Sequence, residues 1–168
     1  LLARNASLNY VLPSALMLEK GSYNLRKEIL TNYTLSLFYA FENREGIFNN
    51  VHRSYKFALM QVANAPAPKN HTIKTMFYKT NIDEIYKREN VIKLKLAQIR
   101  ALSPAHLALQ EVRSKRDLEI LGKAYNAFAP LDSRYLDFRN ELHMTADKDL
   151  FIESYKEGLL PLYEGKMI

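Results

Sequence analysis

Residues 33–41 read Tyr-Thr-Leu-Ser-Leu-Phe-Tyr-Ala-Phe, and residues 54–63 read Ser-Tyr-Lys-Phe-Ala-Leu-Met-Gln-Val-Ala. Both stretches are rich in β-branched and aromatic residues, which favours extended strands. The polar residues 42–52 between them predict an antiparallel pair with a long, functional tip. Alternation within the first stretch predicts two faces, one with Tyr33, Leu35, Leu37, Tyr39 and Phe41, and the other with Thr34, Ser36, Phe38 and Ala40.

A strand and a helix precede this pair. Residues 8–12, Leu-Asn-Tyr-Val-Leu, predict a short strand that ends at Pro13. Residues 18–31 have helical periodicity, although Gly21 weakens the first turn. The expected apolar face holds Leu18, Leu25, Ile29 and Leu30, and the expected polar face holds Lys20, Arg26, Lys27 and Glu28.

Shorter elements follow a linker at residues 65–70, Ala-Pro-Ala-Pro-Lys-Asn. Alternating residues predict strands at 72–79 and 91–96, with a short helix at 82–88 between them. A helix is expected at 115–127, because Ser114 and Asp117 form a capping-box pattern. Its expected buried stripe is Leu118, Leu121, Ala124, Tyr125 and Phe128, and a further short helix is expected near 147–156.

The composition excludes several classes of protein. The 168 residues include no cysteine, so disulfides, thiolate zinc sites and cysteine nucleophiles are excluded. The four histidines lie far apart in the sequence, without metal-ligand spacing. No apolar run approaches the roughly 18 residues of a membrane helix. We therefore expect a cytoplasmic protein without a membrane partner.

Charge is unevenly distributed along the chain. The net charge is +6, with +4 in residues 1–70, +6 in residues 71–116 and −4 in residues 117–168. A basic first two-thirds can attract a phosphate backbone, although solvated lysine faces give the same balance in many proteins.

Three stretches, taken together, resemble one family. The stretches are Leu8-Asn9-Tyr10-Val11-Leu12-Pro13-Ser14-Ala15-Leu16 with Leu25-Arg26-Lys27-Glu28-Ile29-Leu30; Phe41-Glu42-Asn43-Arg44-Glu45-Gly46-Ile47-Phe48 with Val51-His52-Arg53-Ser54-Tyr55-Lys56-Phe57-Ala58-Leu59; and Leu159-Leu160-Pro161-Leu162-Tyr163-Glu164-Gly165-Lys166-Met167-Ile168. In this order they resemble blocks of the large adenine-N6 DNA methyltransferases found in single-chain restriction–modification enzymes, such as type IIG and type ISP.

The resemblance implies an α/β fold, which becomes α+β for this stretch alone. A Rossmann-like, mostly parallel methyltransferase sheet would end in an antiparallel hairpin, followed by a mixed, partly helical region. The implied organisation is residues 1–66 as the C-terminal part of the catalytic domain, 67–113 as a connector and 114–168 as the start of a target-recognition region. Since open sheet edges tend to pair, self-association through 8–12 or 54–63 is also expected.

The resemblance also implies a role for the hairpin tip. These enzymes extrude the target adenine from the duplex and hold it against an aromatic ring. The matching residue is Phe48, with Pro13 beside the same base, and Arg44, Arg53 and Lys56 would contact DNA phosphates. Each has a structural alternative: Phe48 can anchor the loop over the sheet, and the cations can be solvated surface charge.

The family's catalytic motifs do not occur in this sequence. It has no Asn-Pro or Asp-Pro pair for the Asn/Asp-Pro-Pro-Tyr/Phe motif and no glycine-rich donor loop. We therefore expect an interior piece of such an enzyme, with double-stranded DNA as the partner and S-adenosylmethionine as the cofactor of the parent, but no catalytic, cofactor or metal residue here.

Two other functions fit parts of the sequence. One is a non-catalytic DNA-binding or interaction module that shares only the hairpin. The other is a magnesium-dependent nuclease, because Glu164-Gly165-Lys166 with Asp147 or Asp149 imitates an Asp…Glu-x-Lys pattern. Such triplets are common by chance, so this pattern is weak.

Overall fold

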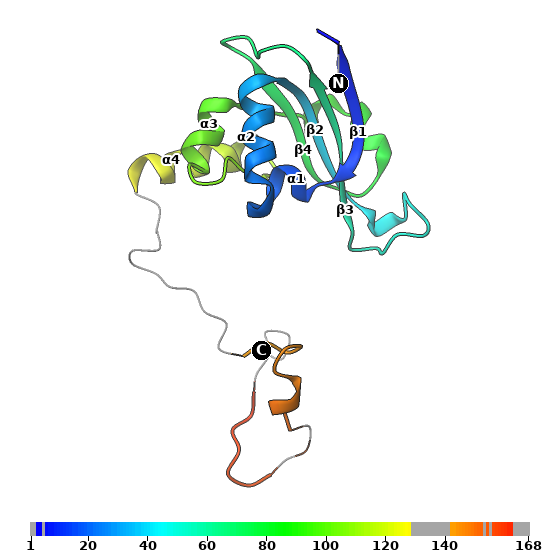
Figure 1. The fold of residues 1–168 in the computed structure, drawn as a ribbon, viewed down its shortest axis with the longest axis vertical. Coiled ribbons are helices and arrows are strands. Elements are labelled where there is room, and N and C mark those ends of the chain that lie inside the picture. Colours follow the sequence, from blue (N-terminus) through cyan, green and yellow to red (C-terminus); the bar gives the residue numbers. More distant parts are fainter. Residues whose placement is uncertain (1–2, 5, 129–141, 153, 155, 163–168) are drawn as a thin grey trace. The chain divides into compact units, whose positions relative to one another are not determined.

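The computed structural model describes residues 3–4, 6–128, 142–152, 154 and 156–162. The chain forms two compact units, Leu1–Pro130 and Leu131–Ile168. The first unit is a mixed α/β structure built on a five-stranded mixed sheet (Figure 1). The strands are β1 Ser7–Pro13, β2 Thr34–Glu42, β3 Lys56–Ala63, β4 Thr72–Lys79 and β5 Ile92–Lys95, in the spatial order β1-β3-β2-β4-β5.

The predicted hairpin is confirmed. β2 and β3 pair antiparallel from Thr34 opposite Ala63 to Glu42 opposite Lys56. β3 also pairs antiparallel with β1, so it lies between β1 and β2 and has no open edge. Residues 56–63 therefore offer no open edge for pairing, and β1 and the short β5 are the edges of this sheet. Self-association through 8–12 stays a prediction.

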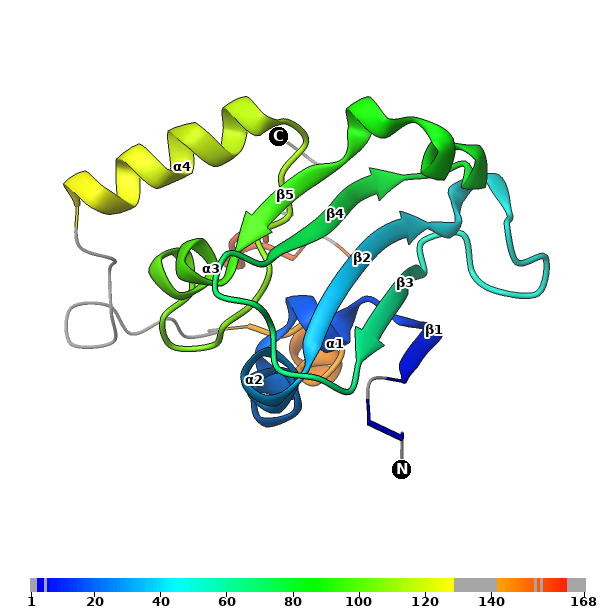
Figure 2. The ribbon, with the colours of Figure 1, turned by 90° about the horizontal axis from the view of Figure 1, so that it is seen from above.

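β4 extends the sheet beyond the hairpin, as Figure 2 shows. It pairs parallel with β2 and antiparallel with β5. The expected domain boundary at residue 66 thus lies between β3 and β4, which belong to the same sheet. The connection from β3 to β4 passes the start of β2, where the Thr34 hydroxyl donates to the Ala65 carbonyl at 2.8 Å and the His71 ring bonds to the Leu35 carbonyl at 2.7 Å.

A β-bulge changes which residues of β2 share a face. Leu35 is opposite Val62 but Leu37 is opposite Gln61, so β2 holds one extra residue here. Leu35 therefore joins Phe38 and Ala40 in the main core, whereas Leu37, Tyr39 and Phe41 lie on the other side. The expected placement of Leu35 beside Tyr39 is wrong for this reason.

The predicted helix at 18–31 begins later than expected. Two short pieces, α1 Ala15–Leu18 and a 3-10 turn at Lys20–Ser22, precede α2 Tyr23–Asn32. Two residues of α2 have the opposite burial from the one predicted. Leu25 is 53% exposed, whereas Arg26 is fully buried.

Backbone carbonyls explain the burial of Arg26. Its guanidinium donates to the His106 carbonyl through two nitrogens, at 3.0 and 2.8 Å, and to the Leu16 carbonyl at 2.7 Å. Burial lowers the pKa of this group. The hydrogen bonds let a charged side chain replace an apolar one at this position, because each buried donor has a partner. Arg26 thereby ties α2 to α1 and to the loop after α3 Leu96–Leu102.

The capping box of α4 Lys115–Ala127 is confirmed. The Ser114 hydroxyl accepts from the Asp117 backbone at 3.2 Å, and the Asp117 carboxylate accepts from the Ser114 backbone at 3.1 Å. The predicted buried stripe is confirmed only at the start of the helix, since Leu118 is buried and Leu121 packs on the core. Ala124, Tyr125 and Phe128 are exposed, because the described core ends near Leu121.

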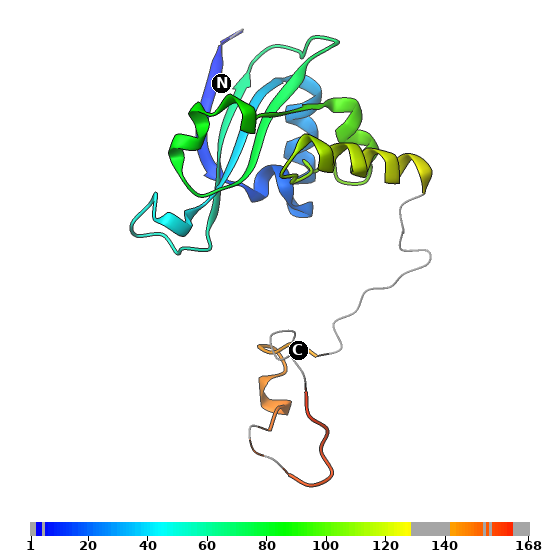
Figure 3. The ribbon, with the colours of Figure 1, turned by 180° about the vertical axis from the view of Figure 1, so that it is seen from behind.

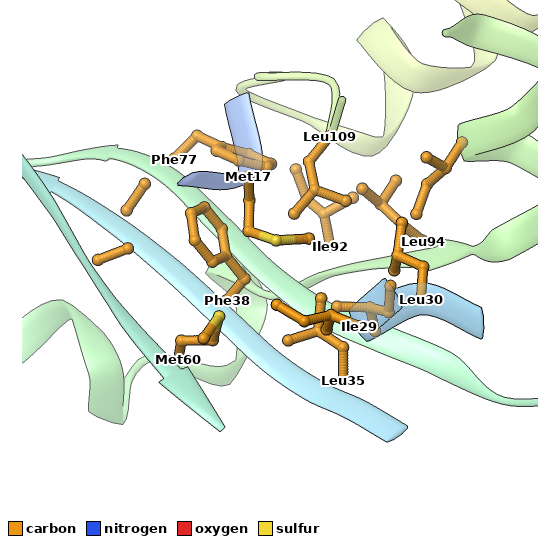
Figure 4. Packing of buried hydrophobic residues seen from close by; sticks show 14 of the residues in the cluster. Met17, Ile29, Leu30, Leu35, Phe38, Met60, Phe77, Ile92, Leu94 and Leu109 are labelled. Atoms are coloured by element: carbon orange, nitrogen blue, oxygen red, sulfur yellow. The ribbon is translucent and has the colours of Figure 1, made fainter. Parts of the chain in front are cut away.

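The two faces of the sheet differ in their cover. One face packs on helices and on the loop before α4, and Met17, Phe38, Leu94 and Leu109 meet there (Figure 4). The other face, seen in Figure 3, is crossed by residues 82–90, which include 3-10 turns at Ile82–Tyr86 and Arg88–Asn90. Its buried residues are Tyr39, Phe41, Phe57 and Met76.

The described part of the second unit contains one 3-10 turn, Lys148–Leu150, in the region where a short helix was predicted. Residues 153 and 155 of that prediction lie outside the described residues. Among the described helices, none is both long and apolar enough to cross a bilayer.

Candidate functional site at the hairpin tip

Asn43 organises the loop between β2 and β3, residues 43–55, which we call the tip loop. Its side chain is fully buried. The Asn43 amide donates to the Phe48 carbonyl at 2.9 Å and to the Val51 carbonyl at 2.8 Å, and its oxygen accepts from the Phe48 backbone at 2.8 Å. One side chain thus supplies hydrogen bonds to backbone groups of the loop, which has no strand pairing to supply them. The tip loop projects beyond the end of the sheet (Figure 2).

Hydrogen bonds to Asn43 hold the backbone of Phe48, but the residue is not enclosed by the protein. Phe48 is 40% exposed. Its ring meets the buried Phe57 edge to face, with centroids 4.9 Å apart and an interplanar angle of 77°. Phe57 in turn stacks on Phe41 at 5.4 Å. Phe48 therefore anchors the loop on Phe57 and is also partly exposed, whereas its contact with a base stays a prediction.

Pro13 lies at the same end of the sheet as Phe48. It is exposed at the end of β1 and is the register partner of Phe57. Register partners share a face of the sheet, so Pro13, Phe57 and Phe41 form one row. The structure therefore brings the two residues expected near a base to neighbouring positions around Phe57.

Arg53 has a local role within the tip loop. Gly46 has φ +76°, and a Cβ at that position would lie 1.6 Å from a guanidinium nitrogen of Arg53. The Arg53 side chain therefore occupies the space that a side chain at residue 46 would need. Arg53 as a residue is exposed.

Arg44, within the tip loop, and Lys56, at the start of β3, already have partners. Arg44 forms an ion pair with Glu42. Lys56 is 3.4 Å from Glu111 and its ammonium is 5.6 Å from the centre of the Tyr78 ring. Arg44, Arg53 and Lys56 therefore do not form one cluster with Phe48.

Several residues of this region were missed in the sequence. The alternation of strand 33–41 ends at Asn43, but nothing local indicates its three side-chain hydrogen bonds. Tyr78 and Arg113 were missed because their contact, with the guanidinium carbon 4.9 Å from the ring centre, joins residues far apart in the chain. A positive φ of 57° at a tyrosine is also invisible in the sequence.

The nuclease pattern remains a prediction, since Glu164 and Lys166 lie outside the described residues. The Asp147 carboxylate accepts from the His143 backbone at 2.6 Å and so closes a turn. Over the described ranges, no group of three or more histidine or acidic side chains could hold a metal ion.

Comparisons with known proteins give likeness to solved structures, five chains of which match. No family model and no curated protein matches the chain. Among solved structures, the chain is similar to "a modification subunit of a putative type I restriction enzyme from Vibrio vulnificus YJ016", with 16% identity and a TM-score of 0.39. The match covers 56% of this chain and 24% of that one, so the chain spans about a quarter of the length of that subunit.

Proposed function

We propose that this chain is the part of an adenine-N6 DNA methyltransferase, from a restriction–modification system, that receives the extruded target adenine. The observation that carries the proposal is the state of Phe48, whose backbone is held by hydrogen bonds from the buried Asn43 side chain while the residue is 40% exposed. In this proposal the base stacks on Phe48, and Pro13 lines the same end of the sheet.

A fixed aromatic ring suits an extruded base for two reasons. Stacking of a base on an aromatic side chain contributes about 1–3 kcal/mol and needs no particular base. A ring on an immobilised loop also loses little conformational entropy on binding, so most of that free energy is retained. A loop aromatic without such support would lose part of it to ordering.

The order of elements agrees with the same proposal. A strand, a helix and an antiparallel hairpin follow one another, as the resemblance to these methyltransferases implies. We assign S-adenosylmethionine binding and methyl transfer to the parent enzyme, since the Asn/Asp-Pro-Pro-Tyr/Phe motif does not occur in this sequence. The ligand of the present chain is then double-stranded DNA with one base out of the stack.

A comparison of matched and mismatched duplexes tests the proposal. Extrusion costs least for a mismatched base, so the chain should bind a duplex with one mismatched adenine more tightly than the matched duplex. Phe48→Ala should reduce this preference by about 5- to 150-fold, which corresponds to the loss of one stacking contact of about 1–3 kcal/mol. Phe48→Trp should retain it, because the indole offers a larger ring face.

Tyr86→Ala is the matched control, since Tyr86 is 78% exposed and lies outside the tip loop. It should leave the preference unchanged. Equal affinity of the unmodified chain for the two duplexes would contradict the proposal and favour a DNA-binding module that extrudes no base. The same conclusion follows if Phe48→Ala retains the full preference.

A further inference from the structure

The end of β4 holds a bulge that redirects Tyr78. Tyr39 is opposite Met76, but Phe41 is opposite Lys79, so β4 contains one extra residue. Tyr78 lies in this interval with φ 57°, a conformation that is costly for a large side chain. Such bulges are enriched beside functional sites, where they change the direction of a side chain.

The redirected ring meets two cations from distant parts of the chain. The guanidinium carbon of Arg113 lies 4.9 Å, and the ammonium of Lys56 5.6 Å, from the centre of the Tyr78 ring. Cation–π contact holds the Arg113 side chain in place but uses only the flat face of the guanidinium. Its N–H donors lie in the plane of the group. Within the described residues they make no hydrogen bond or ion pair, and the Asp117 carboxylate attracts Arg113 only from a longer distance.

A cavity of about 370 Å³ opens beside this ring. It is lined by Glu42, Arg44, Phe77, Tyr78, Lys79, Thr80 and Arg113, and we call it the Tyr78 pocket. Three consecutive residues of β4 line it, which a regular strand with alternating sides would not allow. Its volume is within the range of about 300–1,000 Å³ typical of ligand sites.

The charges that line the Tyr78 pocket leave an excess of positive charge. Arg44, Lys79 and Arg113 face one carboxylate, that of Glu42, which is already paired with Arg44. Lys79 pairs with a carboxylate that does not line the pocket, that of Glu84, at 3.5 Å. Within the described residues, Arg113 is therefore the cation of this pocket without a carboxylate at ion-pair distance, since Asp117 attracts it only from farther away. A bound anion would reduce the repulsion among the three cations.

We propose that the Tyr78 pocket binds a backbone phosphate of duplex DNA, with Arg113 as its principal ligand and Tyr78 as the ring that positions Arg113. Free nucleotides carry the same phosphate chemistry, but the tip loop favours DNA. The Thr80 hydroxyl at the pocket donates to Glu45 of that loop at 2.6 Å, so the pocket and the loop are joined. The inference deepens the proposed function, because both sites would contact one duplex.

The salt dependence of duplex binding tests this inference. Each phosphate contact contributes about 0.9 to the slope of log K against log salt concentration. Arg113→Ala should therefore lower the slope by about 0.9 and the affinity at low salt by about tenfold. Arg113→Lys should keep the slope with part of the affinity, since the charge remains without the planar donors. Tyr78→Phe should behave as the unmodified chain, and Tyr78→Ala should resemble Arg113→Lys, because the charge remains but is no longer positioned.

Arg100→Ala provides the matched control. Arg100 is exposed on α3, which follows β5 at the opposite end of β4 from Tyr78. This variant should change neither slope nor affinity, and circular dichroism should show that all variants are folded. An unchanged slope in Arg113→Ala would overturn the inference, as would the absence of any duplex binding by the unmodified chain.

Two further measurements separate the ligand sources and the two sites. Pyrophosphate and ATP should compete with the duplex only weakly, and binding of ATP as tight as that of the duplex, with the same dependence on Arg113, would overturn the assignment to DNA. The ratio of mismatched to matched affinity should be unchanged in Arg113→Ala. Failure of the phosphate site thus appears in the salt slope, whereas failure of the Phe48 site appears in that ratio.

Discussion

The two faces of the sheet are built by different means. The first face is sealed by α1, α2, α3 and the start of α4, and it contains most of the buried apolar residues. The second face holds four buried residues and is covered by loops, including the tip loop with Ile47 packed on that side. Helices bury a continuous stripe, whereas loops bury single residues. The first face therefore contributes most of the stability, and the second face carries the partly exposed Phe48 at its end.

The largest expected difference between the faces comes from truncating one apolar residue on each. Phe38 is 0% exposed on the first face, so Phe38→Ala should lower the free energy of unfolding by about 3–5 kcal/mol. Leu59 is only half-buried on the second face, so Leu59→Ala should lower it by about 1 kcal/mol. Urea unfolding of the full chain measures both. Equal losses would show that the second face is as well packed as the first.

A smaller effect is expected from Asn43→Ala on the loop-covered side. The variant loses three side-chain hydrogen bonds, but the opened loop can bind water instead, so global stability should change by only about 1–2 kcal/mol. The local change should be easier to detect. Tryptic cleavage after Arg53 should become about 5- to 30-fold faster, since cleavage follows the population of the open loop.

Asn49→Ala is the control for this experiment, because Asn49 is an exposed residue of the same loop. It should leave both stability and cleavage rate unchanged. If Asn43→Ala resists trypsin as well as the unmodified chain does, the tip loop is held by contacts other than those of Asn43, and the support proposed for Phe48 is lost.

The smallest expected effect is on the pH dependence of stability, through the capping box of α4. The hydrogen bond from the Ser114 hydroxyl, followed by the one from the Arg113 backbone, lowers the pKa of Asp117. A lowered pKa means that ionised Asp117 stabilises the fold above the usual pKa of an aspartate, and that this contribution disappears as pH falls through the lowered value. Asp117→Asn should therefore be less stable at neutral pH and show a smaller loss on acidification.

Thermal unfolding between neutral and strongly acidic pH measures this difference. Glu119→Gln removes a carboxylate from the same helix but leaves the capping box intact, so it should follow the unmodified chain. Parallel curves for Asp117→Asn and the unmodified chain would show that the capping box contributes nothing to the pH dependence.

Local signals in the sequence predicted most of the elements. Strand 72–79 and helix 115–127 occur at the predicted residues, since alternation and the Ser114–Asp117 box are local patterns. The order of the strands could not be predicted in the same way. Parallel pairing of β4 with β2, which skips β3, depends on contacts between segments far apart in the chain.

The wrong predictions concerned side chains whose burial depends on residues that are distant in the sequence or on the local pairing of strands. Arg26 was assigned to a polar face because its charge was visible and the carbonyls of His106 and Leu16 were not. Leu35 was assigned to the wrong side because the bulge after it leaves no mark in composition. For the candidate site, the sequence indicated Phe48 and the tip loop, but the Tyr78–Arg113 contact required the fold.

The position of β3 between two partners also has a kinetic consequence. β2 and β3 are joined only by the tip loop, so closing this hairpin costs little chain entropy. β1 pairs with β3 only after a much longer segment of chain has been ordered, because the helix and the hairpin lie between Pro13 and its partner Phe57. We therefore expect the hairpin to assemble early and β1 to dock late, so that an edge of β3 is briefly exposed during folding.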